Sequence, residues 1–139
     1  MKRENLDAYR SKKSEIKELD DKIRNIDKDD SFIVNSTVLD YRTGYPVPRS
    51  VVGVDEVRFN RTLNRYYKRR ELLRQECEDI ENWIEDIEDS LTRRIFRLYF
   101  VEGLSQDNVS RAVHLDKSNV SRKIDKFLKL ATNATNATL

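Results

Sequence analysis

The side chains best suited to chemistry lie together near the C-terminus, along a predicted helix that begins at Lys117. An arginine can donate two hydrogen bonds to the edge of one guanine, while lysines, amides and hydroxyls can bind phosphates. We expect base contacts from three residues near the start of this helix, namely Ser118, Ser121 and Arg122. We expect phosphate contacts from Lys117, Asn119, Lys123 and Lys126, and from Gln106 at the start of the preceding predicted helix.

A second short helix is predicted to hold the first in place. Ser105 is an N-cap candidate for a helix from Gln106, and Asp116 is one for the helix from Lys117. The apolar positions expected to be buried between the two helices are Val109, Val113, Leu115, Val120, Ile124, Phe127 and Leu128. Only three residues, His114 to Asp116, connect the helices, which predicts the sharp crossing of a helix-turn-helix. His114 stands where glycine is frequent, and histidine tolerates a positive φ better than a β-branched residue does.

A further short helix is predicted before this pair. It begins near Ser90, carries Leu91, Ile95 and Leu98 on one face, and ends at Gly103. Residues 90–130 contain 9 Lys and Arg against 4 Asp and Glu, whereas residues 1–89 contain 18 against 21. The basic excess therefore coincides with the predicted helix-turn-helix domain, residues 90–130, and favours a polyanionic partner.

The N-terminal region, residues 1–89, shows two stretches with helical periodicity. In residues 1–30, apolar side chains recur at steps of three and four, at Ile16, Leu19, Ile23 and Ile26, and Tyr9 lies one heptad before them. Residues 55–89 begin with Asp55, an N-cap candidate, and repeat the same spacing over four heptads at Phe59, Leu63, Tyr66, Arg70, Leu73, Cys77, Ile80, Ile84 and Ile87. Such spacing is typical of coiled-coil surfaces.

Charge along these two stretches predicts their orientation. Six cations and no acids occupy Arg58–Arg70, while nine acids and a single cation, Arg74, occupy Glu71–Asp89. The first stretch has the same polarity, so an antiparallel pair would bring opposite charges together. We therefore expect an all-α fold: a long antiparallel, coiled-coil-like helical hairpin followed by the small helix-turn-helix domain. Pairing of the same surfaces between two chains is an alternative, and the run Arg58–Arg70 is either a solvated, hairpin-paired face or a second DNA-backbone contact.

Two segments have no helical pattern. Residues 31–54 hold both prolines and two of the three glycines, which predicts a long loop that is either functional or a loosely packed connector. Residues 131–139 are predicted to form a flexible tail.

A resemblance adds to these predictions. Residues 90–105, SLTRRIFRLYFVEGLS, and the helix-turn-helix after them resemble region 4 of sigma factors. The chain resembles still more closely the small phage late-operon transcriptional activators of the RinA/ArpU type, including residues 39–46 and the tail 129–139. This resemblance implies an N-terminal helical part, a sigma-like DNA-binding domain and activation of phage structural or packaging genes by promoter binding.

We therefore expect a sequence-specific phage transcriptional regulator that binds double-stranded DNA in the bacterial cytoplasm. Host RNA polymerase and a second copy of the chain are two further candidate partners. One alternative is a small terminase-like DNA-packaging subunit, although those usually place the DNA-binding part first. Another is an interaction protein that no longer binds DNA. No catalytic residues, metal site or cofactor are predicted, since one His and one Cys provide no cluster. Neither a signal peptide nor an apolar run long enough to span a membrane is evident.

Overall fold

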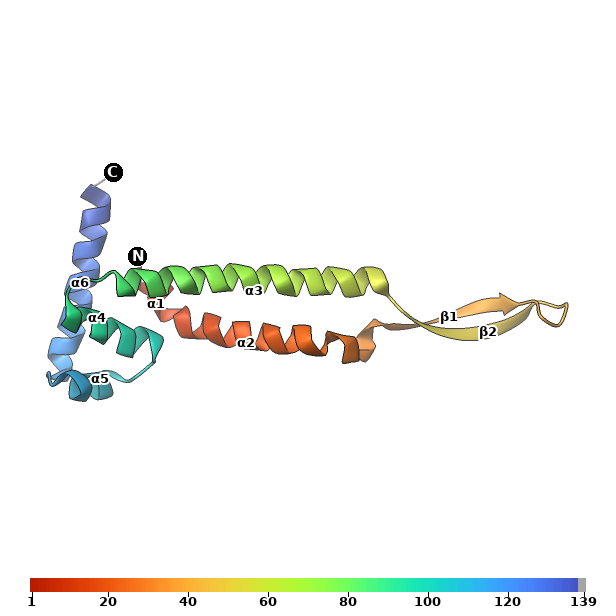
Figure 1. Cartoon of the computed structure of the whole chain (residues 1–139), viewed down its shortest axis with the longest axis horizontal. Helices are drawn as coiled ribbons and strands as arrows, with labels where there is room; N and C mark the ends of the chain where they lie inside the picture. Colours follow the sequence, from red (N-terminus) through yellow and green to blue (C-terminus); the bar gives the residue numbers. More distant parts are fainter. Residues whose placement is uncertain (138–139) are drawn as a thin grey trace. The chain divides into compact units, whose positions relative to one another are not determined.

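The computed structural model describes residues 1–137 (Figure 1). Two helices, α1 (Arg3–Asp7) and α2 (Tyr9–Asn25), are followed by the 3-10 turns η1 (Ile26–Lys28) and η2 (Asp30–Phe32). Strands β1 (Ile33–Asp40) and β2 (Val47–Val54) precede the long helix α3 (Glu56–Glu85). The chain then forms α4 (Ser90–Phe96), a π-helical turn η3 (Arg97–Val101), α5 (Gln106–Val113) and α6 (Lys117–Ala137).

These elements form two compact units. The first unit contains residues 1–17 and the chain from Leu72 onward, and the second contains residues 18–71. The division passes through both α2 and α3, so that each helix contributes one end to each unit.

The predicted all-α fold with a long antiparallel helical hairpin is wrong. The chain is mostly helical but includes a two-stranded antiparallel sheet, and a long helical hairpin is not seen. The heptad spacing correctly indicates a buried stripe, for Leu73, Cys77, Ile80 and Ile84 are buried. It does not indicate what covers that stripe. At the end of α3, the Trp83 ring contacts Phe96 of α4 and Phe127 of α6, so this part of the helix belongs to the core of the first unit.

The predicted loop 31–54 instead forms a β-hairpin. Ile33 pairs with Val54 at one end of the ladder and Asp40 with Val47 at the other, and Gly44 has a φ of +84° in the connecting turn. Half of the strand positions are β-branched, which favours extended backbone. Every strand residue except the half-buried Asp40 is exposed, because neither face of the ribbon is covered within its unit. Pro48 is compatible with this sheet, since both strands of a two-stranded sheet are edges.

Aromatic side chains form the core of the first unit. Phe96 is fully buried, and its ring lies 5.3 Å from that of Phe100 and 5.2 Å from that of Phe127. Burying each large apolar side chain contributes on the order of 1.5–3 kcal/mol. The fully buried Val120 and Ile124 fix the inward face of α6 in the same unit.

Local breaks agree with several predicted element ends. Gly103 follows the π-helical turn with a φ of +74°, and a Cβ there would lie 2.2 Å from Cζ of Arg10. The left-handed backbone is what favours glycine here, since the guanidinium is the end of a flexible, exposed side chain that can shift. Asp55 accepts a hydrogen bond from the Arg58 backbone N–H at 3.1 Å, as expected of the N-cap of α3. Residues 131–137, expected to be a flexible tail, instead continue α6, and residues 138–139 lie outside the described part.

Candidate nucleic-acid interface

Local hydrogen bonds set the geometry of α5 and α6. The Ser105 hydroxyl accepts a hydrogen bond from the Asn108 N–H at 3.2 Å and so caps α5. His114 ends that helix in the left-handed region, with φ 59° and ψ 42°. The N–H of Leu115 then donates to the Ser110 carbonyl at 3.0 Å, which is the bond of a Schellman motif. Three residues separate α5 from α6, which begins at Lys117.

Three predicted site residues lie along the outward face of α6. Ser118, Arg122 and Lys126 are all exposed, and their four-residue spacing places them on one side of the helix. The buried Val120 and Ile124 lie on the other side. Lys129, three residues further along, is also exposed on this outward face; the sequence prediction stopped one turn too early.

The remaining predicted site residues lie at the flanks of this face. Asn119, Ser121, Lys123 and Gln106 are half-buried. Lys117 is exposed, but its Nζ lies 3.7 Å from Oδ1 of Asp107 on α5. Lys117 therefore lies near a carboxylate of the protein itself. Lys123 does so too, because its positive charge interacts with the carboxylate of Asp89.

Asp89 is the N-cap of α4, and its interactions show where Lys123 acts. Hydrogen bonds from the Thr92 hydroxyl, at 2.6 Å, and from the Thr92 N–H, at 3.0 Å, lower the pKa of Asp89. The positive charge of Lys123 makes a smaller contribution in the same direction. The charge of Lys123 is therefore felt at the N-cap of α4.

An arginine from the N-terminus neutralises the one carboxylate on α6. Asp125 is exposed beside the outward face, where a negative charge would repel phosphates. Nη1 of Arg3 in α1 donates to Oδ1 of Asp125 at 2.7 Å. The sequence analysis missed Arg3, because 122 positions separate it from Asp125 and no local pattern connects them.

The start of α2 is fixed to the first unit by a buried polar contact. The Tyr9 hydroxyl donates to the Glu81 carboxylate of α3, and Lys13 Nζ lies 3.1 Å from the same carboxylate. Burial raises the pKa of Tyr9, and the hydrogen bond to Glu81 raises it further. Burial alone would raise the pKa of Glu81, but the hydrogen bonds from Tyr9 and Lys13 outweigh it and lower that pKa. The carboxylate therefore stays ionised between two donors.

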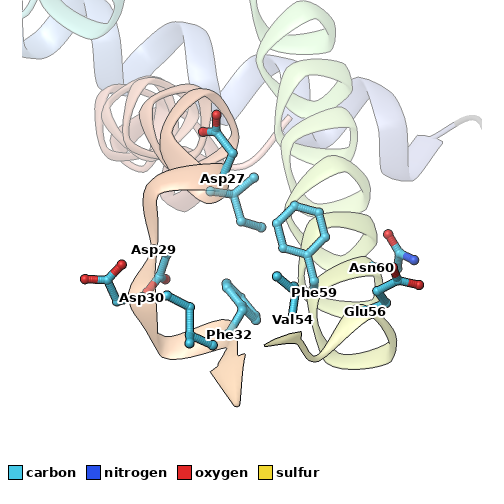
Figure 2. A pocket seen from close by; sticks show the side chains of 10 residues that line it. Asp27, Asp29, Asp30, Phe32, Val54, Glu56, Phe59 and Asn60 are labelled. Carbon is cyan, nitrogen blue, oxygen red and sulfur yellow. The ribbon is translucent and has the colours of Figure 1, made fainter. Parts of the chain in front are cut away.

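The second unit contains a cavity of about 640 Å³ at the base of the β-hairpin (Figure 2). The rings of Phe32 and Phe59, both in its lining, contact each other edge to face, with centroids 5.4 Å apart. Four acidic residues, Asp27, Asp29, Asp30 and Glu56, also line it. Their negative charge disfavours a phosphate ligand there.

No group of three or more His, Cys, Asp or Glu side chains within residues 1–137 is arranged to hold a metal ion. None of the helices in the same range combines the length and apolar character that a membrane span requires.

Helices α5 and α6 are joined by three residues, and α6 presents a polar, cationic outward face. Comparisons with models of known families, with curated proteins and with solved structures find no match to this chain. The functional argument therefore rests on the residues and their geometry.

Proposed function

We propose that the protein is a sequence-specific DNA-binding regulator of phage transcription, which reads the major groove with the first turns of α6. The observation that carries this proposal is the outward face formed by Ser118, Arg122 and Lys126. A major groove about 12 Å wide accepts an α-helix, and residues near the start of a recognition helix reach furthest towards the bases.

Two features of the first unit support this role. The core residues Val120 and Ile124 hold α6 so that its polar side faces solvent rather than the protein interior. The ion pair between Arg3 and Asp125 offsets part of the negative charge near that side. Arg122 forms no hydrogen bond or ion pair with the part of the chain that the structure describes, which leaves its guanidinium available for a guanine edge.

The test begins with a random duplex library, because no operator is assumed. Selection of bound sequences by the intact protein should yield one enriched motif. The affinity for that motif should fall on Arg122→Ala by about 1–3 kcal/mol, or about 5- to 150-fold, with a much smaller loss on scrambled DNA. Fluorescence anisotropy on both duplexes measures the ratio.

Arg122→Lys is the matched control. It keeps the charge but removes the paired hydrogen bonds, so we expect it to retain binding to scrambled DNA and to lose most of the preference for the motif. Failure to enrich any motif, or an equal loss on both duplexes, would contradict the proposal.

We further propose that the regulator is an activator of late or packaging genes and acts in the cytoplasm of the bacterial host. Activation requires a contact with host RNA polymerase, for which the acidic run Glu71–Asp89 is the candidate surface. A reporter placed behind the enriched motif should increase its output when the protein is expressed. A decrease would indicate a repressor that reads the same DNA.

A further inference from the structure

Four cations on α3 form a second charged surface, here named the basic stripe: Arg61, Arg65, Lys68 and Arg69. All four are exposed. At 3.6 residues per turn, they occupy a sector about 100° wide on one side of the helix. No acidic residue occurs between Val57 and Arg70, so none lies within this stripe.

The flanking cations of the same run already have contacts within the second unit. Arg70 Nη1 donates to Oδ1 of Asp20 at 2.8 Å, and the guanidinium of Arg58 lies over the Phe32 ring, 4.9 Å from its centroid. The basic stripe differs, because none of its four members forms a hydrogen bond or ion pair with residues 1–137. Contacts within the chain therefore involve Arg58 and Arg70 at the two ends of the run, whereas the four cations of the stripe are open to solvent and accessible to a ligand.

The arrangement of the stripe opposes helix stability. Arg61 and Arg65 are four residues apart, as are Arg65 and Arg69, and like charges at this spacing destabilise a helix. A bound polyanion would relieve this repulsion.

The spacing of the stripe matches that of a nucleic-acid backbone. At a rise of about 1.5 Å per residue, Arg61 and Arg69 are about 12 Å apart along the helix axis. One strand of duplex DNA presents a phosphate about every 3.4 Å along its axis, or three to four phosphates over this length. We propose that the basic stripe is a second, sequence-independent DNA-binding surface that contacts the phosphate backbone. This inference rests on the proposed function, since it assigns the polyanion to the DNA that the protein regulates.

The salt dependence of DNA binding tests this inference in the intact chain. The triple variant Arg61→Gln, Arg65→Gln, Lys68→Gln should lower the slope of log affinity against log salt by about 2–3, because each phosphate contact contributes about 0.9. Between 50 and 200 mM salt, the wild-type affinity should therefore fall about 40-fold more than that of the variant. A random-sequence duplex of 30 base pairs suffices as the probe, since phosphate contacts do not read sequence.

A matched variant controls for the change in net charge. Lys2→Gln, Lys17→Gln, Lys28→Gln removes three exposed cations that lie outside the stripe and should keep the wild-type slope. The double variant Arg61→Lys, Arg65→Lys should also keep it, since lysine binds phosphate as a point charge. Circular dichroism checks that each variant retains its helix content.

The outcomes separate this inference from the proposed function. A wild-type chain that binds no duplex overturns the proposed function itself. If the wild type binds and the triple variant keeps its slope, only the assignment of the stripe to DNA is overturned, as expected if an acidic protein is its partner. An equal fall in slope for the triple variant and its matched control also overturns the assignment, because it reflects net charge alone.

Discussion

The turn between α5 and α6 depends on the backbone of a single residue. His114 is in the left-handed region, with φ 59° and ψ 42°, and its side chain is exposed. Its imidazole makes no hydrogen bond to the described part of the chain, so we infer that the residue contributes through conformation alone. Substitutions that change only the ease of adopting this backbone should then shift stability in a predictable order.

The magnitudes follow from two opposing terms. A left-handed conformation disfavours an L-residue by roughly 1–2 kcal/mol, and histidine is among the residues that adopt it most readily. His114→Gly removes this strain but adds roughly 0.5–1 kcal/mol of conformational entropy to the unfolded chain. We expect the free energy of unfolding to rise by about 0.5 kcal/mol in the glycine variant. We expect it to fall by about 1–2 kcal/mol in His114→Val, since a β-branched residue is a genuine outlier in this region.

Urea denaturation monitored by tryptophan fluorescence provides the assay. Trp83 is the single tryptophan, and its ring contacts Phe96 and Phe127 in the core of the first unit. A difference of about 2 kcal/mol between the Gly and Val variants should separate their midpoints by about 1 M urea. His114→Asn, which tolerates the left-handed region, serves as the control and should stay near the wild type. Equal destabilisation of the Gly, Asn and Val variants would refute the reasoning, because the imidazole itself would then hold the turn.

Two further predictions concern polar contacts in the first unit. Tyr9→Phe removes the hydrogen bond to Glu81, while the ion pair between Glu81 and Lys13 remains. We expect the free energy of unfolding to fall by about 1.5 kcal/mol. An unchanged urea midpoint would exclude a stabilising role for this hydrogen bond. The pKa of Asp89 is lowered in the folded state mainly by hydrogen bonds from Thr92. The ionised carboxylate therefore stabilises the folded state at a pH above its ordinary pKa of 3.8, and this stabilisation is lost as the pH falls below that value. Asp89→Asn keeps an acceptor for the cap but does not titrate, so its thermal stability should fall less than that of the wild type between pH 5 and pH 2, and parallel profiles would contradict the assignment.

The helices α5 and α6 and the turn between them could be predicted because their determinants are local. Ser105 caps α5 by accepting a hydrogen bond from the N–H of Asn108, only three residues later in the chain. His114 comes directly after the last residue of the helix. The alternation of Val120 and Ile124 with polar neighbours identified the inward side of α6. Neither feature requires knowledge of distant parts of the chain.

The β-hairpin could not be found in the same way. Strands that cover a core alternate apolar and polar residues, whereas β1 and β2 carry apolar side chains on both faces and are exposed throughout. Val34 and Val38 lie on one face, while Ile33 and Leu39 lie on the other. The β-branched content was a usable signal, but the two prolines and the lack of alternation pointed to a loop.

Part of the candidate site was also beyond the reach of sequence patterns. The exposure of Arg122 and Lys126 can be deduced from the periodicity of a single helix. The proximity of Lys123 to Asp89, and that of Arg3 to Asp125, depends instead on tertiary packing. Composition indicated that the C-terminal region was basic. It could not indicate which of those cations are neutralised by the protein and which remain available for a ligand.

The two proposed DNA-binding surfaces contribute differently to recognition. Arg122 lies in the first unit and acts on base edges, so its loss should reduce the preference for one sequence. The basic stripe lies in the second unit and acts on phosphates, so its loss should weaken binding to every sequence alike. Since the two sets of residues have no partner in common, their effects on binding free energy should add when the substitutions are combined. A weakly basic chain could thereby bind duplex DNA tightly, because its cations are concentrated on two surfaces while its acids are paired or grouped elsewhere.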